Sequence, residues 1–469
     1  MIAADSEIES YLREAHSPIV ITMDLFAEKV LNVADKAKVK RVIVCSLADY
    51  MPILTRIGAK AKFSKIDLTC LRDKRIIMWD AFLKLGKGEI INPERLYCDN
   101  IAVWAHTSGT TGMPKTVLLT NKGYNTVALQ YKLCMPSKRQ SVFLNIIVPF
   151  VVYGMLICIH VPLCMGCMVA IVPKFEADDW NKYFKRYKPN HIAGIPSYYS
   201  PILQDKSLKN VDLSGLVSFA AGGDGMNQKL EQEINNFLSS HRSKITLIKG
   251  YGMTEICSSA FTTYNHIQRT GSVGIPLVKN SVCIYDNEKQ CECSYGEEGE
   301  VWISSPALMV GYRADQTATD AQIVTDEKGI KWIRTGDIGY IDEDGFLFLL
   351  GRMKRFIFVG PEGLAYKVFP KKIEDVITKD DSVQETCVVS GQTEKGLAPK
   401  AYVVLKNSCM VAENEITEEL STLCEKLLPD YLRPFSYEYL KELPHTSIGK
   451  IDYQLLEKMA LEKETEIID

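Results

Sequence analysis

The sequence predicts an α/β protein: a large amino-terminal domain with parallel-sheet subdomains and a β-rich subdomain, then a small α+β domain. Apolar runs alternate with helical spacing over residues 190–255, short β-rich segments fill roughly 270–350, and strands and helices mix after residue 354. Alternating strand and helix patterns form parallel sheets, and closely spaced short strands form antiparallel ones. We therefore expect one domain over residues 1–353 and a second over 354–469.

The region 190–255 predicts a β-α-β-α-β unit. Asn227 is placed to cap its second helix, because an Asn side chain accepts a backbone N–H at a helix start. Such units form parallel sheets with right-handed crossovers, and ligands bind beyond the carboxyl ends of their strands. Glycines allow a ligand to approach the backbone closely. We expect a binding cleft at the three strand ends, Gly194–Pro196, Gly222–Gly225 and Gly250–Gly252.

Residues 142–173 contain no acidic or basic side chain and are long enough to span a membrane as one helix. Proline and glycine interrupt the stretch at Pro149, Gly154, Pro162, Gly166 and Pro173. A proline inside a helix removes a hydrogen bond that lipid cannot replace. The pattern favours a buried strand–helix–strand segment over membrane contact.

Composition excludes several classes of protein. Hydrophobic residues make up 46% and charged residues 24%, which is typical of a globular chain. Lys and Arg number 55 against 58 Asp and Glu. The chain therefore lacks the excess of basic residues that would predict nucleic-acid binding. The 14 cysteines are scattered, and residues 1–10 lack the apolar core of a targeting segment. We expect reduced thiols and a cytoplasmic location.

The strongest local signal is HTSGTTGMPK, residues 106–115. Glycines expose backbone N–H groups, hydroxyls donate hydrogen bonds and Lys115 adds a positive charge. Polyphosphates are bound by such groups. The spacing does not fit the GxxxxGK[ST] pattern. The alternative is a solvated polar loop.

Three shorter segments carry weaker signals. YGMTE, residues 251–255, combines an aromatic ring that can stack on a base with a carboxylate that can hold Mg²⁺, although it also fits a capped helix start. Asp337 in RTGD could accept hydrogen bonds from ribose hydroxyls or simply cap a turn. Lys450 follows a glycine in HTSIGK and could act on a ligand or be solvated.

Taken in order, TSGTTGxPK, GG, YGMTE, RTGD, GRxK and a late GK resemble the adenylate-forming superfamily. This superfamily includes acyl-CoA synthetases, luciferases and the adenylation domains of peptide synthetases. The resemblance runs from about residue 5 to 455. The opening part, with ITMDLF and VIVCSLADYMP, is most similar to fatty acyl-CoA ligases.

The resemblance implies an ATP-dependent, AMP-forming acid–thiol ligase. Such enzymes use ATP and Mg²⁺ to convert a small carboxylic acid into an acyl-adenylate, and then transfer the acyl group to a thiol. We expect a fatty or aromatic acid and CoA. A carrier-protein phosphopantetheine is an alternative acceptor, and a non-catalytic nucleotide-binding relative is an alternative of another class.

The resemblance also assigns residues. The β- and γ-phosphates would be held by Thr107, Ser108, Gly109, Thr110, Thr111, Gly112 and Lys115. Adenine would be enclosed by Gly222, Gly223 and Tyr251, and ribose bound by Asp337 and Arg352. Thr254 would contact the α-phosphate, Glu255 would bind Mg²⁺, and Lys450 would bridge the acid and the α-phosphate. The acyl group would be lined by Tyr198, Tyr199, Gly223, Gly250, Ile256, Cys257 and Ser258.

Two further expectations concern the domains. Lys354 matches the superfamily's hinge, so residues 354–469 are expected to form a mobile lid. The phosphate-binding loop begins at residue 107, whereas relatives generally carry a longer first subdomain ahead of it. A shortened subdomain would expose apolar surface, which makes a homo-oligomer an expected possibility.

Overall fold

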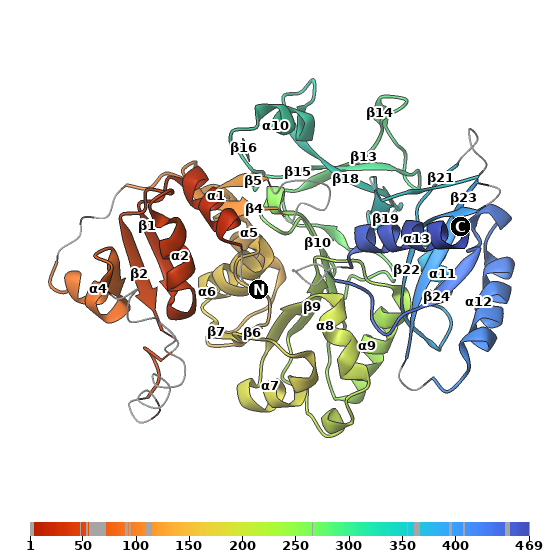
Figure 1. Ribbon diagram of the computed structural model, residues 1–469, viewed down its shortest axis with the longest axis horizontal. Coiled ribbons are helices and arrows are strands. Elements are labelled where there is room, and N and C mark those ends of the chain that lie inside the picture. The colour runs from red at the N-terminus through yellow and green to blue at the C-terminus, as the bar shows by residue number, and fades with distance from the viewer. Residues whose placement is uncertain are drawn as a thin grey trace. The chain divides into compact units, whose positions relative to one another are not determined.

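The computed structural model divides the chain into two compact units, Met1–Arg95 and Leu96–Asp469 (Figure 1). It describes residues 4–46, 48–52, 55, 72–89, 92, 95–107, 115–264, 266–353, 355–360, 366–393, 396–406, 409–445 and 451–468. The mixed α/β fold class is confirmed. The domain boundary expected near residue 354 stays a prediction.

The amino-terminal unit is built on a three-stranded parallel sheet of order β1-β2-β3. Val42 and Val44 of β2 pack against α2, where Val30 and Ala34 are buried four residues apart on one helix face. Its elements are α1 (Asp5–Ala15), β1 (Ile19–Met23), η1 (Asp24–Phe26), α2 (Ala27–Ala34), β2 (Arg41–Cys45), β3 (Ile76–Met78) and α4 (Trp79–Leu85).

The larger unit contains a seven-stranded sheet of order β12-β11-β10-β9-β8-β6-β7. Strands β7, β6, β8, β9 and β10 are parallel, and β11 and β12 continue the sheet antiparallel. The strands are β6 (Val142–Asn145), β7 (Met168–Ile171), β8 (His191–Gly194), β9 (Ser218–Gly222), β10 (Ile248–Tyr251), β11 (Phe261–Thr262) and β12 (Ile275–Pro276). The predicted β-α-β-α-β order of residues 190–255 is confirmed.

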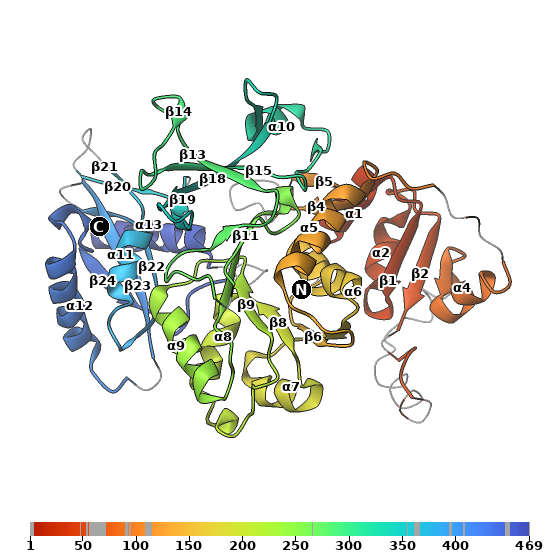
Figure 2. The same cartoon turned by 180° about the vertical axis from the view of Figure 1, so that it is seen from behind.

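Helices cover both faces of this sheet (Figures 1 and 2). Side chains alternate between two cores along each strand: Phe143 packs with α5, η3 and α6, whereas its neighbour Leu144 packs with α7, α8 and α9. The helices are α5 (Asn121–Cys134), η3 (Tyr153–His160), α6 (Val161–Cys164), η4 (Ala177–Asp179), α7 (Trp180–Tyr187), α8 (Pro196–Tyr199), η5 (Ser200–Leu203), η6 (Lys206–Leu208) and α9 (Gln228–Ser240). As predicted, Asn227 caps α9, and its Oδ1 accepts from Leu230 N at 2.7 Å.

The apolar stretch 142–173 folds as strand, helix and strand, which confirms the buried-core interpretation. Its first helix, η3, is a π-helix, a form that the apolar pattern does not predict. Gly154 permits the tight packing, because a Cβ there would lie 2.2 Å from the Val148 carbonyl oxygen. Among the residues that the structure describes, no helix is long and apolar enough to cross a membrane.

The β-rich region is a six-stranded antiparallel sheet, as its short strands predict. Its elements are β13 (Ser281–Asp286), β14 (Cys291–Glu292), β15 (Gly299–Ser304), α10 (Gln316–Gln322), β17 (Ile323–Thr325), β18 (Lys331–Ile341) and β19 (Leu347–Arg352). A separate three-stranded sheet pairs β4 (Ile101–His106), β5 (Thr116–Thr120) and β16 (Gly311–Tyr312). Strands β4 and β5 therefore flank the predicted phosphate-binding loop.

The carboxyl-terminal region has two cores on opposite faces of one sheet. In the β22-β23-β24 sheet, Val388 packs with α11 and α12, and its neighbour Val389 packs with α13. Its elements are β20 (Ile357–Val359), β21 (Tyr366–Val368), α11 (Lys371–Ile377), β22 (Val383–Thr393), β23 (Gly396–Leu405), α12 (Glu413–Leu427), η8 (Asp430–Leu432), β24 (Ser436–Tyr439) and α13 (Tyr453–Ile468). This agrees with the predicted α+β character.

Candidate active site

The larger unit contains a cavity of about 1800 Å³ beyond the carboxyl ends of β8, β9 and β10. This volume exceeds the few hundred to roughly 1,000 Å³ usual for one small molecule, so the cavity can hold more than one reactant. Glycines from the predicted strand ends line it, together with residues of the carboxyl-terminal region such as Glu385 and Tyr453. The cleft expected at these glycines is confirmed.

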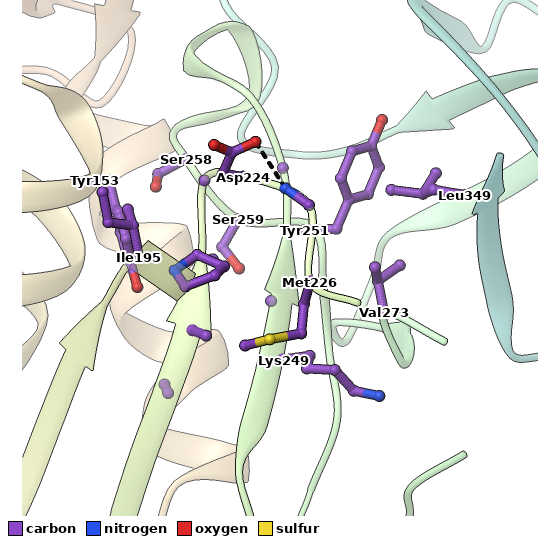
Figure 3. A pocket seen from close by; sticks show the side chains of 18 of the residues that line it. Tyr153, Ile195, Asp224, Met226, Lys249, Tyr251, Ser258, Ser259, Val273 and Leu349 are labelled. Atoms are coloured by element: carbon purple, nitrogen blue, oxygen red, sulfur yellow. Dashed lines mark hydrogen bonds between the residues drawn. The ribbon is translucent and has the colours of Figure 1, made fainter. Parts of the chain in front are cut away.

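Figure 3 shows two sides of this cavity. Tyr153 and Ser258 lie on one side, whereas Tyr251, Val273 and Leu349 lie on the other. Gly222 and Gly223, at the end of β9, also line it, as does Tyr251 at the end of β10. Gly223 has a φ of +83°, a conformation that side-chain-bearing residues rarely adopt.

Tyr251, Asp337 and Arg352 form one hydrogen-bonded cluster, although they come from β10, β18 and β19. The Tyr251 hydroxyl donates to Asp337 Oδ2, and Arg352 Nε lies 2.8 Å from Asp337 Oδ1. Asp337 N donates to Thr335 Oγ1 at 3.0 Å, a hydrogen bond within β18. Burial raises the pKa of Tyr251, and the neighbouring Asp337 carboxylate raises it further. The structure thus brings together three residues that the sequence singled out.

Glu255 and Lys115 both contact a third residue, Tyr312. Glu255 belongs to η7 (Thr254–Ile256), is 7% exposed, and accepts a hydrogen bond from the Tyr312 hydroxyl at 2.7 Å. Lys115 Nζ lies 4.7 Å from the centroid of the Tyr312 ring. Burial and the Glu255 carboxylate raise the pKa of Tyr312. Sequence reasoning missed Tyr312, because no local motif marks it.

The ends of the predicted phosphate-binding loop are held together. Thr107 N donates to Lys115 O at 3.0 Å, and Lys115 N donates to Thr107 Oγ1 at 3.1 Å. Both residues line the cavity, as does Thr254. Several predicted residues lie outside the described part of the chain: Ser108, Gly109, Thr110, Thr111, Gly112, Lys354 and Lys450. His445 and Ile451, which flank the segment containing Lys450, line the cavity.

A buried ion pair in the cavity wall was also missed. Lys249 Nζ lies 2.6 Å from Glu231 Oε1, and their side chains are 6% and 5% exposed. Lys249 Nζ also donates to Arg269 O at 3.2 Å, and Gly271 N donates to Glu231 Oε2 at 3.2 Å. Burial lowers the pKa of Lys249, and the hydrogen bond to Glu231 opposes that shift. The pair ties β10 and α9 to the turn that carries Val273.

The apolar part of the cavity wall, called the apolar arm below, differs partly from the expected acyl site. Four expected residues line the cavity: Tyr198, Gly223, Gly250 and Ser258. Three do not, and the expectation was wrong for Tyr199, Ile256 and Cys257, which are fully buried elsewhere. Tyr199 packs in the core under α9, and its hydroxyl donates to Ala220 O at 2.6 Å. The apolar arm is instead lined by apolar residues of β6, of η3 and of the loop between them, and by the residue that follows β8: Phe143, Ile147, Val152, Tyr153, Ile157 and Ile195.

One acidic residue of the cavity, Glu255, fits the way in which proteins commonly hold Mg²⁺. Among the described residues, no group of three or more His, Cys, Asp or Glu side chains could hold a metal ion. Glu255 offers a single buried carboxylate inside the cavity. Mg²⁺ is commonly held by one or two carboxylates together with substrate phosphates and water, so Glu255 fits that mode.

Comparisons with known proteins agree with this arrangement. Residues 3–313 match the family model described as AMP-binding enzyme, and residues 372–450 match that of the AMP-binding enzyme C-terminal domain. A long-chain-fatty-acid–CoA ligase of Bacillus subtilis (strain 168) is 29% identical over 473 residues, covering 98% of this chain and 80% of that protein. The enzyme of the same name from Salmonella typhimurium is 27% identical over 458 residues, covering 95% and 77%.

Solved structures share the fold. The anthranilate CoA ligase AuaEII in complex with anthranoyl-AMP has a TM-score of 0.78 at 20% identity, covering 99% of this chain and 82% of that one. ATP-bound MatB from Rhodopseudomonas palustris also has a TM-score of 0.78, at 22% identity, covering 97% and 82%. At these identities the likeness describes the fold alone.

Replacing Lys249 by methionine will destabilise the larger unit. The substitution leaves the Glu231 carboxylate buried without its partner, which costs about 3–5 kcal/mol of unfolding free energy. Urea unfolding followed by circular dichroism measures the loss. Lys182→Met is the control, because it breaks the exposed pair with Asp179, and such pairs contribute at most about 1 kcal/mol. Equal stability of the two variants would contradict the prediction.

Proposed function

The chain belongs to the AMP-binding enzyme family, and we propose that it is an AMP-forming acid–CoA ligase acting on a fatty or aromatic carboxylic acid. One observation carries the proposal. The Tyr251–Asp337–Arg352 cluster, the Glu255 carboxylate and an apolar arm all open into one cavity. Polar groups for a nucleotide and apolar walls for an acid are what such a ligase requires.

In the first half-reaction, a carboxylate oxygen of the acid attacks the α-phosphorus of ATP in line, and pyrophosphate leaves. Gly222, Gly223 and Tyr251 enclose the adenine, and Asp337 and Arg352 bind the ribose. Tyr251 and Arg352 both contact the Asp337 carboxylate, which supports a shared role next to the nucleoside. Thr254 contacts the α-phosphate. The β- and γ-phosphates are bound by Thr107, Ser108, Gly109, Thr110, Thr111, Gly112 and Lys115.

Glu255 holds Mg²⁺ in this proposal. The bound ion supplies positive charge that offsets the negative charge of the phosphate oxygens. Glu255 itself is oriented by the Tyr312 hydroxyl, and its burial keeps water from competing for the carboxylate.

Lys450 is the proposed catalytic residue of the first half-reaction. Attack by a carboxylate on a phosphate brings two anions together, and a positioned ammonium stabilises the charge that develops. His445 and Ile451 line the cavity and form a short antiparallel bridge across the segment that contains Lys450. Their position supports a role for this segment at the reacting atoms.

The acid binds in the apolar arm, with its carboxylate toward the α-phosphate. The arm is walled by Phe143, Ile147 and Ile157, which offer apolar contacts and no charged partner for a substituent on the acid. Burial of each methylene contributes roughly 0.8 kcal/mol. This environment favours alkyl chains and aromatic rings over amino acids, in agreement with the substrates named for the relatives.

In the second half-reaction, the thiol of CoA attacks the acyl carbonyl carbon and AMP leaves. We propose that residues 354–469 move as a lid between the two steps, with Lys354 as the hinge. Lys229–Asp381 at 2.7 Å and Lys406–Glu233 at 3.1 Å join α9 to this region. Both pairs reach solvent, where an ion pair contributes only about 0–1 kcal/mol. Such weak contacts suit a lid that must separate.

We expect exchange of labelled pyrophosphate into ATP that depends on an added acid, since adenylation is reversible before the thiol attacks. Octanoate, palmitate, benzoate and cinnamate form the panel, and glycine is the control acid. Adding CoA, or a holo-carrier protein in a parallel assay, identifies the acceptor through AMP release. ATP binding with no exchange for any acid would instead assign the chain to non-catalytic nucleotide binding.

Lys450→Ala is expected to lower the rate of adenylation by about 10²–10³-fold, the usual effect of losing one oriented charge at a transition state. Thioester formation from a synthetic acyl-adenylate and CoA should persist, because no phosphate is attacked in that step. Both rates are measured by single-turnover product analysis. Lys441→Ala, an exposed lysine of the same region, is the control. Equal losses in the two half-reactions would refute this role of Lys450.

A further inference from the structure

Tyr312 contacts two groups of opposite charge that come from distant parts of the chain. Its hydroxyl donates to Glu255 Oε1 at 2.7 Å, across 57 residues of sequence. Its ring lies 4.7 Å from Lys115 Nζ. The tyrosine is 7% exposed and belongs to the core that includes α5 and η3. One side chain therefore contacts both the proposed phosphate-binding lysine and the proposed magnesium-binding carboxylate.

Backbone hydrogen bonds fix the position of Tyr312. Strand β16 pairs antiparallel with β5, with Tyr312 opposite Val117. Tyr312 N donates to Thr319 Oγ1 at 2.9 Å, and Arg313 N donates to Thr116 O at 2.8 Å. Thr116 immediately follows Lys115, so the pairing of these strands also places the lysine. The sheet thus fixes the backbone position of Tyr312 and of Thr116, the neighbour of Lys115.

The Glu255 segment is attached to the same strand. Met309 N donates to Glu255 O at 2.8 Å, and Val310 N donates to Leu118 O at 3.0 Å. Residues 309–312 therefore bridge the backbone that follows β10 and the backbone that follows the phosphate-binding loop. Hydrogen bonds from residues 309–313 thus hold the backbone of Glu255 and that of Thr116, next to Lys115.

The two contacts of Tyr312 differ in kind. The hydroxyl donates a directed hydrogen bond that orients the carboxylate and leaves its second oxygen available. The ring attracts the ammonium through its electron-rich face, which is weak and needs no particular N–H direction. Within the described part of the chain, Lys115 has no ion pair with any carboxylate. Its N–H groups are therefore available for phosphate oxygens.

We propose that Tyr312 is a positioning residue that keeps Lys115 and Glu255 from pairing with each other. Without the hydrogen bond and the ring contact that Tyr312 supplies, the ammonium and the carboxylate would be free to attract each other. Each charge would then be neutralised before it could meet its ligand. Tyr312 thereby leaves the Lys115 ammonium available to phosphate oxygens and the Glu255 carboxylate available to a divalent cation. The inference rests on the proposed function, which assigns those two ligands.

Two variants separate the contributions of the hydroxyl and the ring. Tyr312→Phe keeps the ring and removes the donor, so Glu255 loses its orientation. Loss of such an outer partner typically weakens metal affinity by 10–100-fold. Tyr312→Leu also removes the ring, so Lys115 can pair with Glu255 and the affinity for metal-free nucleotide should fall as well. Tyr199→Phe is the control, because it removes a buried hydroxyl, hydrogen-bonded to Ala220 O, in a different core.

The readouts are binding measurements. Electron paramagnetic resonance follows Mn²⁺ binding in the presence of a non-hydrolysable ATP analogue, and calorimetry follows binding of that analogue in EDTA. We expect Tyr312→Phe to weaken Mn²⁺ binding about 10–100-fold with unchanged affinity for the metal-free analogue. Tyr312→Leu should weaken both by at least that factor. Thermal denaturation confirms that the variants are folded.

The outcomes separate this inference from the proposed function. If the wild-type chain binds the analogue and Mn²⁺ but both Tyr312 variants match Tyr199→Phe, the role of Tyr312 is overturned and the ligase proposal stands. If the wild-type chain binds neither, the ligase proposal fails and the Tyr312 inference fails with it. If only Tyr312→Leu weakens binding, the hydroxyl has no orienting role and that part of the inference is rejected.

Discussion

Burial of both faces of the central parallel sheet decides where this chain can bind a ligand. Helices cover each face, and alternate strand residues such as Phe143 and Leu144 enter different cores. Polar groups facing either core would lose their water without replacement. The edge beyond the carboxyl ends of the strands is therefore the place where glycine backbones and charged side chains meet. Glu255 follows β10 at that edge, and Asp337 reaches it from the β-rich sheet.

The cavity keeps its charges in defined arrangements. Asp337 is paired with Arg352, and Lys249 is paired with Glu231. Two opposite charges at about 4 Å attract by roughly 4 kcal/mol at an effective dielectric constant of 20, so unpaired charges in such a space tend to find one another. In the proposed role of Tyr312, its ring contact with Lys115 and its hydrogen bond to Glu255 keep these two charges from pairing. A site that binds phosphates and a cation needs charges of both signs that have not already neutralised each other.

The carboxyl-terminal region has two packed hydrophobic cores, whereas the ion pairs that join it to α9 are weak. Its sheet is covered on both sides, by α11 and α12 on one face and α13 on the other. Its ion pairs with α9 reach solvent and are screened by salt. In the proposed mechanism, two reactions share one cavity, first with a phosphate and then with a thiol, and they need different groups at the reacting atoms. A stable lobe with weak attachments would supply both sets by moving as one body, as the proposal requires.

Local sequence patterns determined much of this protein. The alternation of apolar runs and helical spacing predicts the parallel sheet, Asn227 caps α9, and the prolines and glycines of residues 142–173 indicate a buried strand–helix–strand segment. Tyr251, Glu255 and Asp337 stand in short motifs that are ambiguous one by one, and the order of the motifs along the chain marks these residues as candidates. These features depend on residues that are close together in the chain, so they can be predicted from the sequence.

Tertiary structure decided which distant groups touch. The Lys249–Glu231 pair spans 18 residues and the Tyr312–Glu255 hydrogen bond spans 57, and both follow from strand pairing and helix packing. The burial of Tyr199 and Cys257, and the π-helix that shapes the apolar arm, were equally hidden from the sequence pattern. Periodicity reports which face of an element is buried. It does not report what that face meets, because the partner is chosen by the packing of the whole unit.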